Sequence, residues 1–119
     1  MQAQHVLVVE GDAALRTALA RYLTRHGYTV SVAGSLAEAR AHLAASVPDA
    51  VILSLELPDG TGEVLLPDVS VPVIALSIGD RMHPPEEATV AAYLRKPFAF
   101  PALGQALGAV LREAGSRKA

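Results

Sequence analysis

The chain has 119 residues, of which 51% are hydrophobic, and this length and composition fit one globular domain with one buried core. Its formal net charge of -2 gives little attraction to nucleic acid or to anionic lipid, so we expect neither as a partner of this chain. The sequence contains no cysteine, which excludes disulfides and thiolate metal sites. Because it shows no signal peptide and no apolar run long enough to cross a bilayer, a cytoplasmic location is expected.

The chain opens with a short apolar run that is followed by polar residues. Residues 5–9 are rich in β-branched side chains and predict a buried strand. Asp12 is placed to cap a helix in which apolar residues recur every three or four positions until Gly27 ends it. The sequence therefore predicts a strand and an amphipathic helix as its first unit.

Two further strands follow, with one helix between them. Residues 29–33 predict the second strand, and Ser35 and Glu38 have the spacing of a capping box at the start of a helix. Pro48 is expected to stop that helix. Residues 50–54 are almost wholly apolar, which is typical of a strand covered on both faces.

The second half of the chain predicts two more strands and a final helix. A helix over residues 63–66 would be brief, because Pro67 closes it. Residues 71–76 and 91–94 predict strands, and an amphipathic helix is expected from near Pro101. This alternation of strands and helices predicts an α/β fold with a doubly wound, five-stranded parallel sheet.

Chemistry in open parallel sheets gathers at the carboxyl ends of the strands, an edge that we call the rim. The residues expected at the rim are Glu10, Gly11, Asp12, Ser54, Glu56, Ser77 and Lys96. Acids, hydroxyls and one lysine thus converge there, and the rim is the candidate functional site. The four histidines lie on different predicted elements without the spacing of metal ligands, so we expect no histidine metal site.

Four motifs, in this order, resemble the receiver domains of two-component response regulators. They are Glu10-Gly11-Asp12, the stretch 48–60 with its Leu57-Pro58-Asp59 turn, the stretch 71–77, and Lys96-Pro97-Phe98. The resemblance covers nearly the whole chain and implies a flavodoxin-like (βα)5 fold. It implies one receiver-like domain over residues 1–119, with an ordered core of about 4–114, and a cis peptide bond before Pro97.

In that family an acid pair after the first strand and an aspartate at the end of the third hold magnesium, and the aspartate accepts a phosphoryl group. By the resemblance, Ser54 stands at the position of the aspartate and Gly11 at one position of the acid pair. A hydroxyl needs a general base to become a nucleophile and is a weaker ligand for a hard cation. We therefore expect no cofactor, with Mg²⁺ binding absent or weak. The remaining oxygen ligands would be Glu10, Asp12 and Glu56, although a helix cap is favoured for Asp12 and a solvated loop position for Glu56.

The resemblance assigns roles to three further residues. Lys96 matches a lysine that contacts the phosphoryl group and, without that anion, is expected to pair with Glu10. Ser77 matches the hydroxyl that follows phosphorylation in relatives, and Tyr93 matches their switch-like aromatic residue. A strand-end hydroxyl and a half-buried packing aromatic are equally open interpretations of these two residues.

Family members build a full helix between the fourth and fifth strands, and this chain departs from that pattern. Pro84 and Pro85 are adjacent, and a helix cannot run through them. We expect the fourth helix to be reduced to a turn around residues 86–88 or to be absent.

Two functions remain open at this point. The first is an atypical receiver domain in bacterial phosphorelay signalling that is no enzyme but a phosphorylation-independent protein-interaction module, with a histidine kinase or an effector domain as candidate partner. The alternative is a small-ligand-binding α/β domain that reuses the rim pocket. The vestigial phosphorylation pocket of the first hypothesis comprises Glu10, Gly11, Asp12, Ser54, Ser77 and Lys96, and the ligand pocket of the alternative comprises Glu10, Ser54, Ser77 and Lys96. The partner, the oligomeric state and the presence of an effector domain after Ala119 stay open.

Overall fold

The computed structural model describes residues 3–78 and 90–118, and a parallel sheet lies at its centre. The strands of this sheet are β1 (His5–Val9), β2 (Thr29–Ala33), β3 (Ala50–Ser54), β6 (Val73–Ile78) and β7 (Val90–Lys96). In the described part of the chain they form one five-stranded sheet with the order β2-β1-β3-β6-β7. This order confirms the doubly wound, flavodoxin-like arrangement expected from the sequence.

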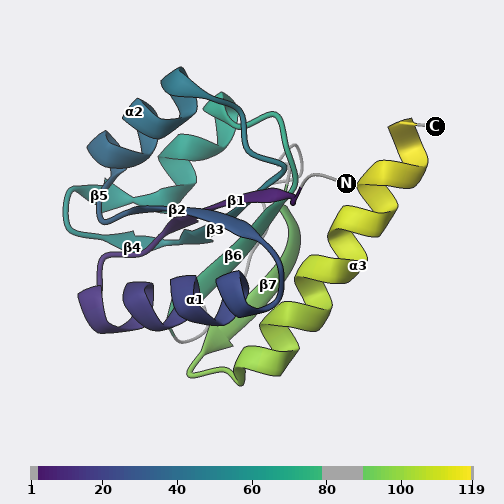
Figure 1. Cartoon of the computed structure of the whole chain (residues 1–119). Helices are drawn as coiled ribbons and strands as arrows, with labels where there is room; N and C mark the ends of the chain where they lie inside the picture. The colour runs from purple at the N-terminus through teal and green to yellow at the C-terminus, as the bar shows by residue number, and fades with distance from the viewer. Residues whose placement is uncertain (1–2, 79–89, 119) are drawn as a thin grey trace.

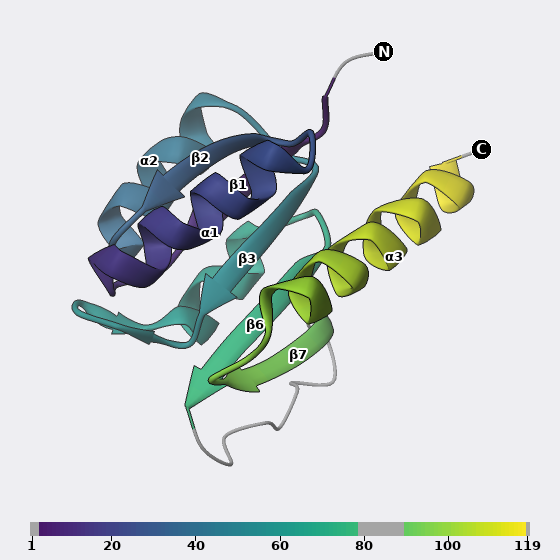
Figure 2. The same ribbon diagram turned by 60° about the horizontal axis from the view of Figure 1, so that its bottom comes forward.

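Helices cover both faces of the sheet (Figures 1 and 2). On one face lie α1 (Ala13–Arg25) and α3 (Phe100–Lys118), which share one hydrophobic cluster with the strands. On the other lie α2 (Leu36–Ala45) and the 3-10 helix η1 (Gly62–Asp68), which share a second cluster. The three-layer arrangement explains why the strands are apolar on both sides.

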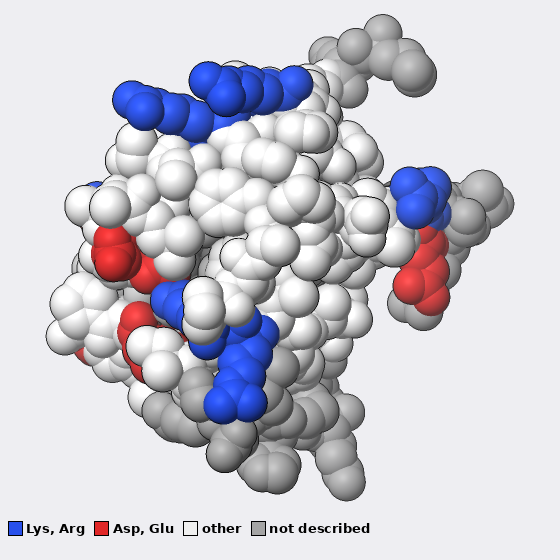
Figure 3. Space-filling view, turned by 90° about the horizontal axis from the view of Figure 1, so that it is seen from below, with Lys and Arg blue, Asp and Glu red and all other residues white. Residues whose placement is uncertain are grey.

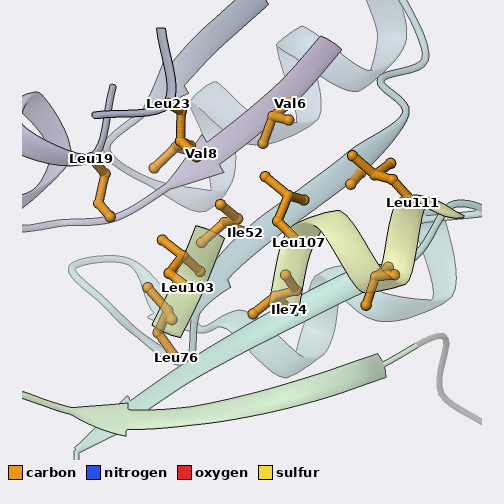
Figure 4. Packing of buried hydrophobic residues seen from close by; sticks show 12 residues of the cluster. Val6, Val8, Leu19, Leu23, Ile52, Ile74, Leu76, Leu103, Leu107 and Leu111 are labelled. Atoms are coloured by element: carbon orange, nitrogen blue, oxygen red, sulfur yellow. The ribbon is translucent and has the colours of Figure 1, made fainter. Parts of the chain in front are cut away.

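Alternate residues of the central strands β1 and β3 serve the two clusters. Along β1, Val6 and Val8 point to the α1 and α3 side, whereas Leu7 and Val9 point to the α2 and η1 side. Figure 4 shows the first cluster, in which Leu107 of α3 lies among side chains of the strands and α1. Burial of a Val or Leu side chain stabilises a fold by about 1.5–3 kcal/mol. These two clusters therefore fix the strands whose ends make the rim.

Strand boundaries in the second half differ from the expected ones. The strand expected over 71–76 is β6, which begins two residues later at Val73. Pro72 has no N–H for the ladder and contributes only its carbonyl, which accepts a hydrogen bond from the Val51 amide at 3.0 Å. The strand expected over 91–94 is longer, because β7 pairs with β6 as far as Ile78 opposite Lys96. The extension of β7 carries Lys96 to the rim, whereas the later start of β6 lies at the opposite edge of the sheet.

The loop after β3 is more regular than the sequence indicates. It forms an antiparallel hairpin of β4 (Glu56–Leu57) and β5 (Gly60–Thr61), where the sequence predicts a loop with the Leu57-Pro58-Asp59 turn. The brief helix expected over 63–66 is the 3-10 helix η1, and Pro67 lies inside it instead of ending it. This is tolerated because the Val69 amide donates to the Leu66 carbonyl at 3.1 Å and closes the turn around the proline.

The predicted helix caps are present at α1 and α2. The Asp12 carboxylate accepts from the Leu15 amide at 3.1 Å, and Gly27 follows α1 with a φ of 91°. At α2 the Ser35 hydroxyl accepts from the Glu38 amide, while the Glu38 carboxylate accepts from the Gly34 amide, one residue before the cap. Both helices thus start where their capping residues predict.

Asp59, in the hairpin turn, supplies a second cap to α2 from far along the sequence. Its carboxylate accepts from the Leu36 amide at 2.9 Å and from the Ala37 amide at 3.2 Å. The hydrogen bond from Leu36 is the main cause that lowers the pKa of the Asp59 carboxyl below its usual 3.8. The cap therefore joins the loop after β3 to the start of α2.

We expect this cap to make stability depend on acid pH. Because the pKa of Asp59 is lower in the folded state, its contribution is present above the unfolded value, about pH 4, and is lost as pH falls through the folded value. Asp59→Asn should thus lose less stability than the wild type between pH 5 and 3, measured by urea unfolding. Asp68→Asn removes an equal charge at an exposed site and should follow the wild type; identical pH profiles for all three proteins would contradict the prediction.

The expected reduction of the fourth helix, at Pro84, Pro85 and residues 86–88, falls on residues 79–89 and so lies outside the described residues. Within residues 3–78 and 90–118, no helix is both long and apolar enough to cross a membrane.

Candidate functional site

The ends of four strands bring the predicted rim residues together. Glu10 directly follows β1, Ser54 ends β3, Ser77 lies at the end of β6 and Lys96 ends β7. The parallel register places Ser54 beside Leu76 and Lys96 beside Ile78. Glu10 is 2% exposed, and Ser54 and Ser77 are fully buried. Buried polar groups of this kind require partners inside the protein.

Lys96 is the centre of the first group of contacts. Its ammonium lies 2.7 Å from Oε1 of Glu10 and donates a hydrogen bond to the Ser54 hydroxyl at 3.1 Å. Within the described residues, that carboxylate oxygen accepts no hydrogen bond, so Lys96 serves as its counterion. The ion pair expected between Lys96 and Glu10 is therefore present in the structure, and the peptide bond before Pro97 is cis as expected.

Glu56 is the centre of the second group of contacts. Oε2 of its carboxylate accepts from the Ser77 hydroxyl at 3.0 Å, and Oε1 accepts from the Ile78 amide at 3.1 Å. Its backbone carbonyl accepts from the Ser54 hydroxyl at 3.2 Å. The favoured interpretation of Glu56 as a solvated loop residue is thus wrong. Pairing with Thr61 in the hairpin holds the Glu56 backbone beside the end of β6, where its carboxylate is hydrogen-bonded.

The segment after β1 closes another side of the rim. The Asp12 amide donates to Oε2 of Glu10 at 3.0 Å, while the Asp12 carboxylate caps α1. At Gly11, a Cβ atom would lie 3.1 Å from Cδ of Pro58, which leaves little room for a side chain. Asp12 thus acts as a helix cap in this structure, and Gly11 lies against the hairpin turn.

Sequence reasoning missed one basic residue next to the rim. Nη1 of Arg16, in α1, donates to the backbone carbonyl of Glu10 at 2.9 Å. Arg16 follows the capping residue Asp12 by one helical turn, and this spacing is the signal that could have found it. A guanidinium group held in this way adds positive charge next to the rim.

A match to a known family model identifies the family of this chain. The family model of the response regulator receiver domain matches residues 6–108. The chain belongs to the response regulator receiver domain family. Receiver domains act in two-component signalling, where they interact with histidine kinases and effector domains.

Several curated proteins resemble this receiver domain. The KDP operon transcriptional regulatory protein KdpE of Escherichia coli is 36% identical over 115 residues, which cover 91% of this chain and 51% of KdpE. The DNA-binding transcriptional regulator NtrC of a Bradyrhizobium strain is 32% identical, over 98% of this chain and 26% of NtrC. The chain therefore spans about half of the first relative and a quarter of the second.

A solved structure supports the fold independently. The CheY-like receiver domain protein of Methanospirillum hungatei superposes with a TM-score of 0.86, at 21% identity, over 98% of this chain and 99% of that one. At this identity the likeness concerns the fold alone.

The described residues of this receiver domain offer little to a metal ion. No group of three His, Cys, Asp or Glu side chains within residues 3–78 and 90–118 is placed to hold one. The three carboxylates considered for weak Mg²⁺ binding are each engaged: Glu10 with Lys96, Asp12 with the start of α1, and Glu56 with the end of β6. Magnesium would have to displace these contacts to acquire several oxygen ligands.

Tyr93 lies away from these contacts, in the middle of β7 opposite Ala75 of β6. The side chain is half-buried. Burial is the main cause that raises the pKa of the Tyr93 hydroxyl above 10.0, and the negative charge of Glu63 adds to it. The switch role of Tyr93 stays a prediction.

Proposed function

We propose that this receiver domain works as a protein-interaction module without aspartyl phosphorylation. The observation that carries the proposal is Ser54, which is fully buried at the end of β3 and hydrogen-bonded on both sides, to Lys96 and to the Glu56 carbonyl. It has no carboxylate that could become an acyl phosphate. The charged groups next to it, those of Lys96 and Glu10, are paired with each other.

The contacts of Ser54 also argue against a serine nucleophile. The ammonium of Lys96 is paired with Glu10 and donates to Ser54, so it is a charged donor and no base. The proton of Ser54 points to a peptide carbonyl, which cannot accept it as a general base does. These contacts support a role as a signalling module and no role in catalysis.

The face seen in Figure 3 suits a protein partner better than nucleic acid. Seen from below, acidic and basic side chains lie close to one another on the molecule (Figure 3). Such a mixed surface suits a protein partner, whereas phosphate backbones favour a basic face. We propose a histidine kinase or an effector domain as that partner. We also propose that residues 1–119 form one domain with an ordered core of about 4–114, and that it acts in the cytoplasm.

The alternative of a small-ligand site at the rim has less support. The polar groups of Glu10, Ser54, Ser77 and Lys96 are bonded within the protein. A hollow of about 410 Å³ lies elsewhere, between α1 and α3, where Tyr22 and Gly104 are among its lining residues.

Treatment with acetyl phosphate and Mg²⁺ is expected to add no phosphoryl group to the wild-type chain, measured by intact mass spectrometry. The reason is the missing carboxylate at Ser54. A stoichiometric, alkali-labile phosphate would overturn the proposed function.

The variant Ser54→Asp with Gly11→Asp is the matched control. It returns two carboxylates to the rim, and the new side chain at residue 11 needs Pro58 to move by a few tenths of an ångström. We expect this variant to gain Mg²⁺ binding over the wild type in a calorimetric titration. An unchanged titration would show that the internal contacts of Lys96 and Glu56 keep the site closed.

A further inference from the structure

The carboxylate of Glu56 receives two hydrogen bonds from consecutive residues at the end of β6. The Ser77 hydroxyl reaches Oε2 at 3.0 Å, and the Ile78 amide reaches Oε1 at 3.1 Å. A hydroxyl and a backbone N–H that converge in this way on one anionic group are a common means of binding a small oxyanion. Here the anion is part of the chain.

Several contacts fix the Glu56 backbone, so its carboxylate is held close to Ser77 and Ile78. Glu56 pairs with Thr61 in the hairpin, and its carbonyl accepts from the Ser54 hydroxyl. The same Ser54 hydroxyl accepts from the Lys96 ammonium, so a positive charge lies beside the residue that holds the Glu56 carbonyl. Little entropy is therefore lost when the carboxylate occupies this position.

We propose that the Glu56 carboxylate is a built-in anion, which permanently occupies the position where the Ser77 hydroxyl and the Ile78 amide converge at the end of β6. A free anion of matching chemistry is a small tetrahedral oxyanion such as inorganic phosphate. The inference rests on the proposed function and deepens it. When the end of β6 already holds an anion, no phosphoryl group is needed for it to adopt its anion-bound conformation. The built-in carboxylate sets that arrangement permanently.

Removal of the carboxylate should therefore open the site to inorganic phosphate. In Glu56→Ala, a phosphate titration followed by amide NMR should give saturable shifts at Ser77 and Ile78, with affinity about tenfold or more above that of the wild type. The wild type should show no saturation at these two amides over the phosphate concentrations that saturate Glu56→Ala. Sodium chloride at equal ionic strength serves as the background, because screening alone must not reproduce the effect.

Two further variants keep the test decisive. Asp68→Ala removes the same charge from an exposed carboxylate and should leave Ser77 and Ile78 insensitive to phosphate. Glu56→Gln keeps the side-chain volume and one acceptor oxygen but is neutral, so its phosphate affinity should lie between those of the wild type and Glu56→Ala. It takes the place of Glu56→Ala if the amide spectrum of that variant is no longer that of the folded chain.

The inference is overturned if folded Glu56→Ala and Glu56→Gln show no saturable shift, if the wild type binds phosphate equally well, or if Asp68→Ala gains the same affinity. None of these results bears on acyl phosphate formation, which mass spectrometry measures separately. A phosphorylated wild type overturns the proposed function instead.

Discussion

Lys96→Met is expected to destabilise the chain by about 3–5 kcal/mol, because it leaves the Glu10 carboxylate buried without a counterion. Glu10 is 2% exposed, and the ammonium 2.7 Å away is its ion-pair partner. The substitution keeps most of the apolar stem of Lys96 but also removes the donor to Ser54. Urea unfolding at pH 7, followed by circular dichroism, would measure the loss.

A double variant measures how much of this loss comes from the unpaired charge of Glu10. Glu10→Gln combined with Lys96→Met removes both charges, so it should regain more than half of the loss seen in Lys96→Met alone. Arg40→Met is the exposed control, because the Arg40 and Asp68 side chains lie 3.8 Å apart and more than half exposed. That substitution should change stability by less than about 1 kcal/mol. If Lys96→Met were equally mild, the carboxylate of Glu10 would have to be satisfied without its lysine.

The sequence predicts the rim well because strand direction decides it. Apolar, β-branched runs locate the strands, and parallel strands must bring their carboxyl ends to one edge. Glu10, Ser54, Ser77 and Lys96 therefore meet as expected, and the ion pair of Lys96 with Glu10 is the one that the resemblance to receiver domains implies. Local rules of this kind also place the caps of α1 and α2.

What the sequence does not predict depends on contacts between distant segments. Glu56 looks like a loop residue until the hairpin turns its carboxylate to Ser77. Asp59 caps α2 from more than twenty residues away, and no local spacing rule reaches that far. The start of β6 is a different case, because it shifts where Pro72 lacks an amide hydrogen, a detail that hydrophobicity alone ignores. Tertiary geometry, more than residue type, decides the positions of Glu56 and Asp59.

Gly62→Ala is expected to cost about 3 kcal/mol, because a buried methyl group would overlap the Ser54 carbonyl oxygen. Two atoms of the Leu53 side chain would also lie 3.1 Å from the new carbon. The glycine is needed here for close approach of two backbones, and its amide donates to the Leu55 carbonyl at 2.9 Å. Neither side can yield easily, since the obstacle is the backbone of a central strand.

Gly108→Ala, within α3, is the matched control for that cost. The nearest atom to its new methyl group is the flexible end of Arg112, at 3.3 Å, so the helix should gain about 1 kcal/mol from alanine. The two substitutions add the same atoms and should have opposite signs in urea unfolding. The first also displaces the hairpin that carries Glu56, so the amide signals of Ser77 and Ile78 should shift in Gly62→Ala and stay unchanged in Gly108→Ala. A stable Gly62→Ala with unmoved signals would show that the hairpin does not need this close approach to hold Glu56 against β6.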